Sequence, residues 1–178
     1  MGNWELPPKG PHLDSTDSIY FQNMTGHEVR ERLQKNDLII IPVGSTEAHG
    51  LAQPFGEDTL LVSRISEMVA RETGCTVAQP VWYGSHPANH LGMPGTVVVD
   101  DEVFVAYLRS IIAGFWNAGF RKQILVNGHG QEEVIPAALH GFSKRYQVPA
   151  VLVSLHWWTP IHTFLFDKAH GGPFDTPF

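Results

Sequence analysis

The segment Ser45-Thr46-Glu47-Ala48-His49-Gly50, followed by Asp58, contains three good metal ligands. It comes directly after the apolar run 38–43, which has the composition of a buried strand. If the backbone stays extended, the side chains of Glu47 and His49 project to the same side, because they are two residues apart. Carboxylate and imidazole ligands without a thiolate suit Zn²⁺, Mn²⁺ or Fe²⁺ acting as Lewis acids, and they do not suit a closed structural zinc site. The chemistry that these residues indicate is activation of water.

Alternating strands and helices are predicted around this motif. The sequence Thr25-Gly26-His27-Glu28 has the spacing of a capping box at the start of a short helix. Further helices are predicted from Asp58 or Thr59 to Gly74, from 100–101 to about 119, and over 131–146, with strands over 38–43, 76–80, 122–126 and 150–154. Strands separated by such helices favour right-handed crossovers, a mainly parallel sheet and helices on both faces. The expected fold class is therefore α/β, in three α/β/α layers.

Histidine or aromatic residues follow all four predicted strands. In open parallel sheets, ligands bind beyond the carboxyl ends of the strands. The four segments are 45–50, Trp82-Tyr83-Gly84-Ser85-His86, Asn127-Gly128-His129-Gly130-Gln131-Glu132 and His156-Trp157-Trp158. Packing alone is a poor explanation for four such strand ends, so we expect them to converge on one site.

Composition limits the class of protein. The chain has 178 residues, of which 43% are hydrophobic, and a net charge of −6 without a basic stripe, which argues against nucleic-acid or membrane-surface partners. No apolar run is long enough to cross a bilayer, and the single Cys75 excludes an internal disulfide. We predict a cytoplasmic protein with an irregular arm over 1–22 and a single domain over 23–178.

Several motifs together resemble the creatininase family of metal-dependent hydrolases. They are Pro42-Val43-Gly44-Ser45-Thr46-Glu47-Ala48-His49-Gly50, Gly56-Glu57-Asp58, Pro94-Gly95-Thr96 and Asn127-Gly128-His129-Gly130. The resemblance implies a three-layer α/β fold, two divalent metal ions and assembly into homo-oligomers, commonly hexamers. It also implies that Glu47 and His129 bind one ion, that His49 binds the other, and that Asp58 bridges the two.

The end of the chain leaves two interpretations open. Members of this family supply a further ligand from a motif of the form His-Ala-Gly-x-x-Glu-Thr, and His170-Gly171-Gly172-Pro173-Phe174-Asp175-Thr176 has a similar outline. Either Asp175 is that ligand, or the true motif lies in sequence beyond this chain, in which case a separate C-terminal chain could complete the fold. We favour the second interpretation because Pro173 opposes a helix here. By resemblance His170 is the candidate general acid, with His90 and then His156 as alternatives.

The substrate is expected to be a small molecule. The segments 82–87, 114–120 and 127–132 look most like the branch of the family that hydrolyses diketo-inositols in inositol catabolism, the 3-dehydro-scyllo-inosose hydrolases. In that reaction a carbon–carbon bond of the ring is cleaved. Candidate substrate-binding residues are His86, Gln131, Trp157 and Trp158. A cyclic-amide hydrolase is the alternative, and a non-catalytic metal-binding subunit that needs a partner chain is a hypothesis from another class.

Overall fold

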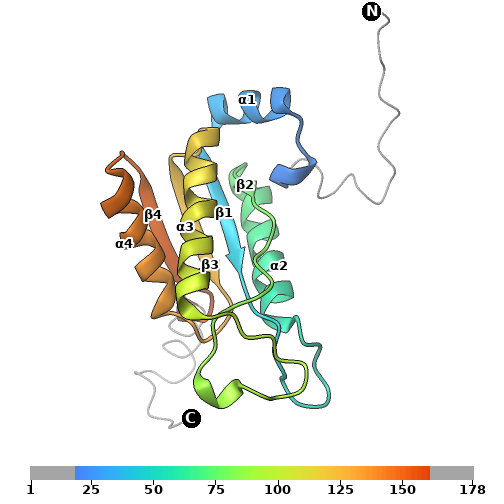
Figure 1. Ribbon diagram of the computed structural model, residues 1–178. Coiled ribbons are helices and arrows are strands. Elements are labelled where there is room, and N and C mark those ends of the chain that lie inside the picture. Colours follow the sequence, from blue (N-terminus) through green and yellow to red (C-terminus); the bar gives the residue numbers. More distant parts are fainter. Residues whose placement is uncertain (1–18, 161–178) are drawn as a thin grey trace, which may run out of the picture.

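The computed structural model describes residues 19–160, which form one sheet with helices packed against it (Figure 1). The sheet consists of the strands β1 (Leu38–Val43), β2 (Thr76–Val77), β3 (Lys122–Asn127) and β4 (Val151–His156). All neighbouring strands are parallel, and their order is β2-β1-β3-β4. The helices are α1 (Gly26–Lys35), α2 (Glu57–Thr73), α3 (Asp101–Ala118) and α4 (Val134–Tyr146), with short 3-10 turns at η1 (Phe21–Asn23) and η2 (Ala88–His90).

Alternating side chains of β1 build a core on each face of the sheet. Ile39 and Ile41 pack in a cluster with residues of α3 and α4, which lie side by side on one face. Ile40 belongs to a second cluster with Val62 of α2 and Val126 of β3, so α2 covers the other face. Figure 1 shows this arrangement, with α2 opposite α3 and α4. The predicted α/β fold with helices on both faces is confirmed.

Most helix ends follow the predicted signals, although α2 begins at Glu57, with Gly56 as its N-cap, and not at Asp58 or Thr59. Thr25 and Glu28 form both hydrogen bonds of a capping box at the start of α1. Gly74 and Gly119 end α2 and α3 in the left-handed conformation, with φ of 67° and 116°. The prediction for α4 was wrong at its start: the helix begins at Val134, three residues after the predicted Gln131, because residues 127–133 form the loop of the site described below.

The predicted irregular arm over 1–22 needs correction at its end. Ile19 and Tyr20 are buried in the cluster on the α2 face. The Val77 amide donates to the Ile19 carbonyl, and the Tyr20 hydroxyl donates to Glu67 of α2 at 2.8 Å. These residues therefore lie beside β2, where Tyr20 forms an isolated parallel bridge with Val77, whereas residues 1–18 lie outside the described part of the chain.

Strand β4 forms one edge of the sheet and is the least buried strand. Val151, Val153 and Leu155 are between 39% and 57% exposed, so no described element covers that side of the strand. Among residues 19–160, no helix is long and apolar enough to span a membrane.

Candidate metal centre

The carboxyl ends of β1 and β3 bring two loops and the start of α2 together. Val43 and Asn127 are paired at the ends of these strands, and the Gly128 amide donates to the Val43 carbonyl at 2.8 Å. Gly128 also lies against the first turn of α2: an added Cβ would be 2.5 Å from the backbone oxygen of Asp58. This close approach requires glycine and places His129 beside Asp58.

Glu47, His49, Asp58 and His129 converge at this position, as the sequence predicted. Glu47 Oε1 lies 2.9 Å from His129 Nδ1 and 3.3 Å from His49 Nε2. Asp58 reaches the same two rings, with Oδ1 3.3 Å from His49 Nε2 and Oδ2 3.2 Å from His129 Nδ1. Each carboxylate therefore has an oxygen within 3.3 Å of a ring nitrogen of both histidines. Glu47, Asp58 and His129 are buried, and the side chain of His49 is 22% exposed.

Two more histidines face the other oxygen of Glu47. His90 Nδ1 is 3.1 Å and His86 Nδ1 is 3.4 Å from Oε2. The two Nδ1 atoms are 3.4 Å apart, and the His86 ring lies 4.3 Å from that of His129, centre to centre. The side chain of His86 is fully buried, whereas that of His90, in η2, is 26% exposed. The sequence predicted that His86 binds substrate, which stays a prediction, and the structure places its ring beside the potential metal ligands Glu47 and His129.

The protonation of His129 reflects its carboxylate neighbours. Burial by itself lowers the pKa of this imidazole, but hydrogen bonds to Asp58 and Glu47 outweigh burial and raise the pKa to about 9 without a bound cation. Burial opposes the charged forms of Glu47 and Asp58 too, yet the bonds from His129 lower both carboxyl pKa values. In His86 burial and repulsion from His129 lower the pKa. Without a cation, the proton on His129 Nδ1 lies between the carboxylates of Glu47 and Asp58. A metal cation could occupy the same position.

Backbone and hydroxyl groups orient these ligands. His129 Nε2 is 3.0 Å from the carbonyl oxygen of Ser85. Because a carbonyl only accepts, His129 donates from Nε2 and directs Nδ1 at the carboxylates. The Ser45 hydroxyl donates to Asp58 Oδ2 at 2.6 Å. The roles of Ser45 and Ser85 were missed in the sequence, although Ser45 lies within the first motif.

Gln131 holds the loops of the site together. Its Oε1 accepts from the Ser85 amide at 3.0 Å, and its Nε2 donates to the Gly44 carbonyl and to Asn127 Oδ1 at 3.2 and 3.1 Å. The residue is 3% exposed. Both amide hydrogens are thus used within the protein, which favours a bracing role. Contact between Gln131 and substrate stays a prediction.

The two tryptophans after β4 point to different surroundings. Trp157 packs against the core cluster on the α2 face. Trp158 is 43% exposed and stacks on His156, with ring centres 3.8 Å apart and an interplanar angle of 19°. Nε2 of His156 lies 3.1 Å from Glu132. Trp158 is therefore the exposed member of the pair, and contact of either tryptophan with substrate stays a prediction.

A cavity of about 540 Å³ opens next to the ligand cluster. It is lined by Ser85, His86, Pro87, Asp101 and residues 130–134. His86 belongs to both the cavity and the cluster, so a molecule bound in the cavity lies beside the ligands. Its volume is in the range of small-molecule sites.

The donor set fits divalent metal ions. Two groups have one ligand atom from each member within 4.8 Å of the others: Glu47, His49 and Asp58, and Glu47, His86 and His129. Carboxylate oxygen and imidazole nitrogen suit zinc or manganese. His170 and Asp175, the candidate acid and the candidate last ligand, lie outside the described residues.

An α/β sheet carrying a carboxylate–imidazole cluster at its strand ends defines a protein with a candidate metal centre. The family model described as creatininase, creatinine amidohydrolase, matches residues 22–177. The chain therefore belongs to the creatininase family, as the sequence motifs indicated.

Two curated relatives differ in their similarity to the chain. A 3-dehydro-scyllo-inosose hydrolase of Thermotoga maritima is 60% identical over 166 residues, which is 93% of this chain and 53% of the relative. A creatinine amidohydrolase of Pseudomonas putida is 27% identical over 183 residues, which is 89% of this chain and 70% of the relative. The chain thus spans about half the length of the first relative.

Solved creatininase structures share the fold. One creatinine amidohydrolase superimposes with a TM-score of 0.80 at 21% identity, covering 89% of this chain and 65% of that chain. A mutant creatininase described as Zn-Zn type has a TM-score of 0.79 at 21% identity, with 88% and 65% coverage. A creatininase described as Mn has a TM-score of 0.76 at 22% identity, with 86% and 66% coverage.

Proposed function

We propose that this chain carries the metal centre of a hydrolase that opens 3-dehydro-scyllo-inosose, with two divalent ions, zinc or manganese, as cofactors. The observation that carries the proposal is the 60% identity with the Thermotoga maritima enzyme across 93% of this chain, which includes all the residues of the cluster. The metals come from the donor set and from relatives described as Zn-Zn type and Mn. Domain extent over 23–178, assembly into homo-oligomers and completion by a further C-terminal segment are parts of the proposal.

In the proposed ligand set Glu47 and His129 would hold one ion, His49 would hold the other, and Asp58 would be a ligand of both. Each carboxylate already spans both imidazoles, which is the arrangement that a shared pair of ions needs. When bound, the ions supply Lewis acidity, which activates water and polarises a substrate carbonyl. Glu47 and Asp58 supply the negative charge that holds two cations in a buried site.

The reaction adds one water across a carbon–carbon bond. The hydroxyl adds to a ring carbonyl carbon, the bond to the neighbouring carbon breaks, and that carbon takes a proton, which gives an open-chain keto acid. Among the described residues, His90 is the best placed to move this proton, because its ring is partly exposed and lies 3.1 Å from Glu47. Glu132 and Asp101 lie at the cavity and could accept hydrogen bonds from ring hydroxyls.

The test is an assay of the purified, metal-loaded chain with the diketo-inositol and, separately, with creatinine. We expect the diketo-inositol to be converted to a product one water heavier by mass spectrometry, and the Asp58→Asn variant to lose this activity while keeping its circular dichroism spectrum. Hydrolysis of creatinine alone would instead support the cyclic-amide alternative. Metal binding without hydrolysis of either compound would support the non-catalytic subunit.

A further inference from the structure

His86 has surroundings that differ from those of an ordinary core histidine. Its side chain is fully buried, and its Nε2 has no hydrogen-bond partner among the described residues. The polar groups recorded near its Nδ1 are the carboxylate of Glu47 and the ring nitrogen of His90, both at 3.4 Å. Both distances are long for hydrogen bonds. The Nδ1 atom of this buried imidazole therefore faces potential metal ligands and lacks the close hydrogen-bond partner that buried polar groups normally have.

The loop that carries His86 is held on three sides. The carbonyl of Ser85 accepts from His129 Nε2, and the amide of Ser85 donates to Gln131 Oε1. The Ser85 hydroxyl donates to Asp101 at the start of α3. The peptide next to His86 is therefore clamped to the same His129 whose Nδ1 faces the carboxylates. This clamp keeps His86 and His129 in contact, with ring centres 4.3 Å apart.

The proposed ligand set leaves a place for His86. Zinc in proteins usually takes four ligands and can expand to five. Glu47 and His129, with the shared Asp58, provide three ligands for the first ion, and Glu47, His86 and His129 offer one ligand atom each within 4.8 Å of one another, so His86 is placed to be a further ligand of this ion. His90 lies closer to Glu47 than His86 does, at 3.1 Å, but its side chain is 26% exposed and it belongs to neither candidate metal group among the described residues.

We propose that His86 is a protein ligand of the first metal ion, through Nδ1, together with Glu47 and His129, and that Gln131 and Ser85 position it. This inference rests on the proposed dinuclear site and changes its composition: three imidazoles instead of two surround the two carboxylates. His90 remains outside the ligand set, at the exposed side of the cluster, where it can meet a substrate.

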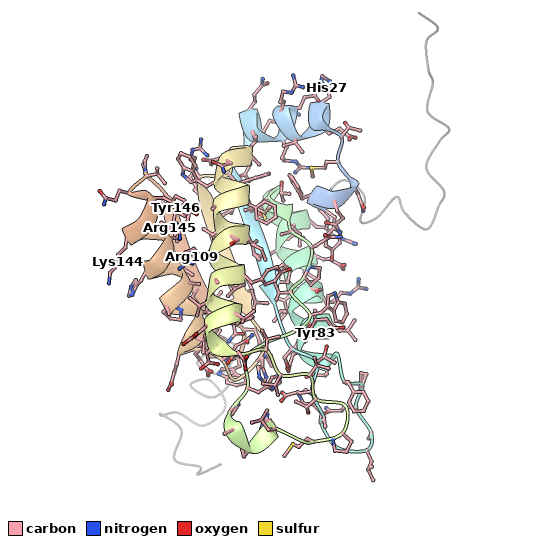
Figure 2. All side chains as sticks on the ribbon, in the orientation of Figure 1. His27, Tyr83, Arg109, Lys144, Arg145 and Tyr146 are labelled. Atoms are coloured by element: carbon pink, nitrogen blue, oxygen red, sulfur yellow. The ribbon has the colours of Figure 1, made fainter. Side chains whose placement is uncertain are left out.

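Metal quantification in variants tests this assignment. The full chain and its His86→Asn, His90→Asn and His27→Asn variants are loaded with zinc, freed of unbound metal, and analysed for zinc per chain. We expect about two ions in the unaltered chain and in the His90 and His27 variants, and about one in His86→Asn. His27 is the matched control, because it lies on α1 (Figure 2) with a side chain that is 79% exposed. Two ions held with unchanged affinity by His86→Asn would overturn the inference.

A measurement on the unaltered chain covers the case in which His86→Asn fails to fold. With spin-active cadmium and nitrogen-labelled histidine, each imidazole bound to the metal shows a cadmium–nitrogen coupling. We expect three coupled imidazoles, and coupling to only His49 and His129 would overturn the assignment of His86. If the unaltered chain binds no metal in either experiment, the proposed function itself fails, which is a distinct result.

Discussion

Replacement of Gly128 by alanine should damage the metal centre without removing any ligand. An added Cβ would lie 2.5 Å from the backbone oxygen of Asp58, whereas ordinary contacts begin at 3.4 Å. The loop and α2 must therefore separate by about 0.9 Å, the difference between these two distances. His129 Nδ1 and Asp58 Oδ2, now 3.2 Å apart, stand on the two segments that are forced apart.

The expected cost follows from overpacking. Such substitutions typically destabilise by about 1–3 kcal/mol, which corresponds to a fall in Tm of roughly 2–12 °C for a chain of this size. Ligand positions in metal sites tolerate deviations of only about 0.2 Å, so we expect zinc affinity to fall at least about 10-fold, as it does when outer groups of metal sites are disturbed. Thermal unfolding and competition with a chromogenic chelator measure the two effects.

Gly130 provides the matched control in the same loop. An added Cβ there has no atom within 4 Å, and its φ lies outside the left-handed region. Gly130→Ala should therefore keep both Tm and zinc affinity. If Gly128→Ala binds zinc as tightly as the unaltered chain, the close approach of this loop to α2 does not set the ligand geometry, and the reasoning is refuted.

Three further predictions concern the support of the site and the edge of the fold. Ser45→Ala removes the hydroxyl that donates to Asp58, so zinc affinity should fall about 10-fold. Ser66→Ala is the control: it removes an equally buried hydroxyl inside α2 and should change Tm but not zinc affinity. Equal losses of zinc affinity in the two variants would contradict a role of Ser45 in positioning Asp58. Tyr20→Phe removes the bond to Glu67 and should lower the free energy of unfolding by about 1 kcal/mol in chemical denaturation, with zinc binding kept; no change would mean that the bond contributes nothing. Because bound ions stabilise only the folded chain, zinc at about 100 times its Kd should raise the free energy of unfolding by about 2.7 kcal/mol. A Tm that does not change when zinc or a chelator is added would argue against a metal site.

Local patterns predicted most of the elements for identifiable reasons. Capping at Thr25 and left-handed ends at Gly74 and Gly119 depend on the residues at those positions, so the sequence shows them directly. The start of α4 was less predictable, because the segment before Val134 belongs to the loop of the metal centre and its hydrogen bonds go to other loops. The burial of Ile19 depends on pairing with Val77, which is distant in the chain.

The sequence by itself determined the type of chemistry: acidic and imidazole ligands placed directly after apolar strands, whose parallel pairing must bring them to one end of the sheet. Only the tertiary structure decided which neutral side chains lie beside those ligands. It placed His86 against His129 and turned Gln131 to the backbone of two other loops. It also separated Trp157 from Trp158. Contacts of this kind depend on how closely loops from different crossovers approach one another. The periodicity of the sequence predicts local elements, but it does not predict the distance between such loops.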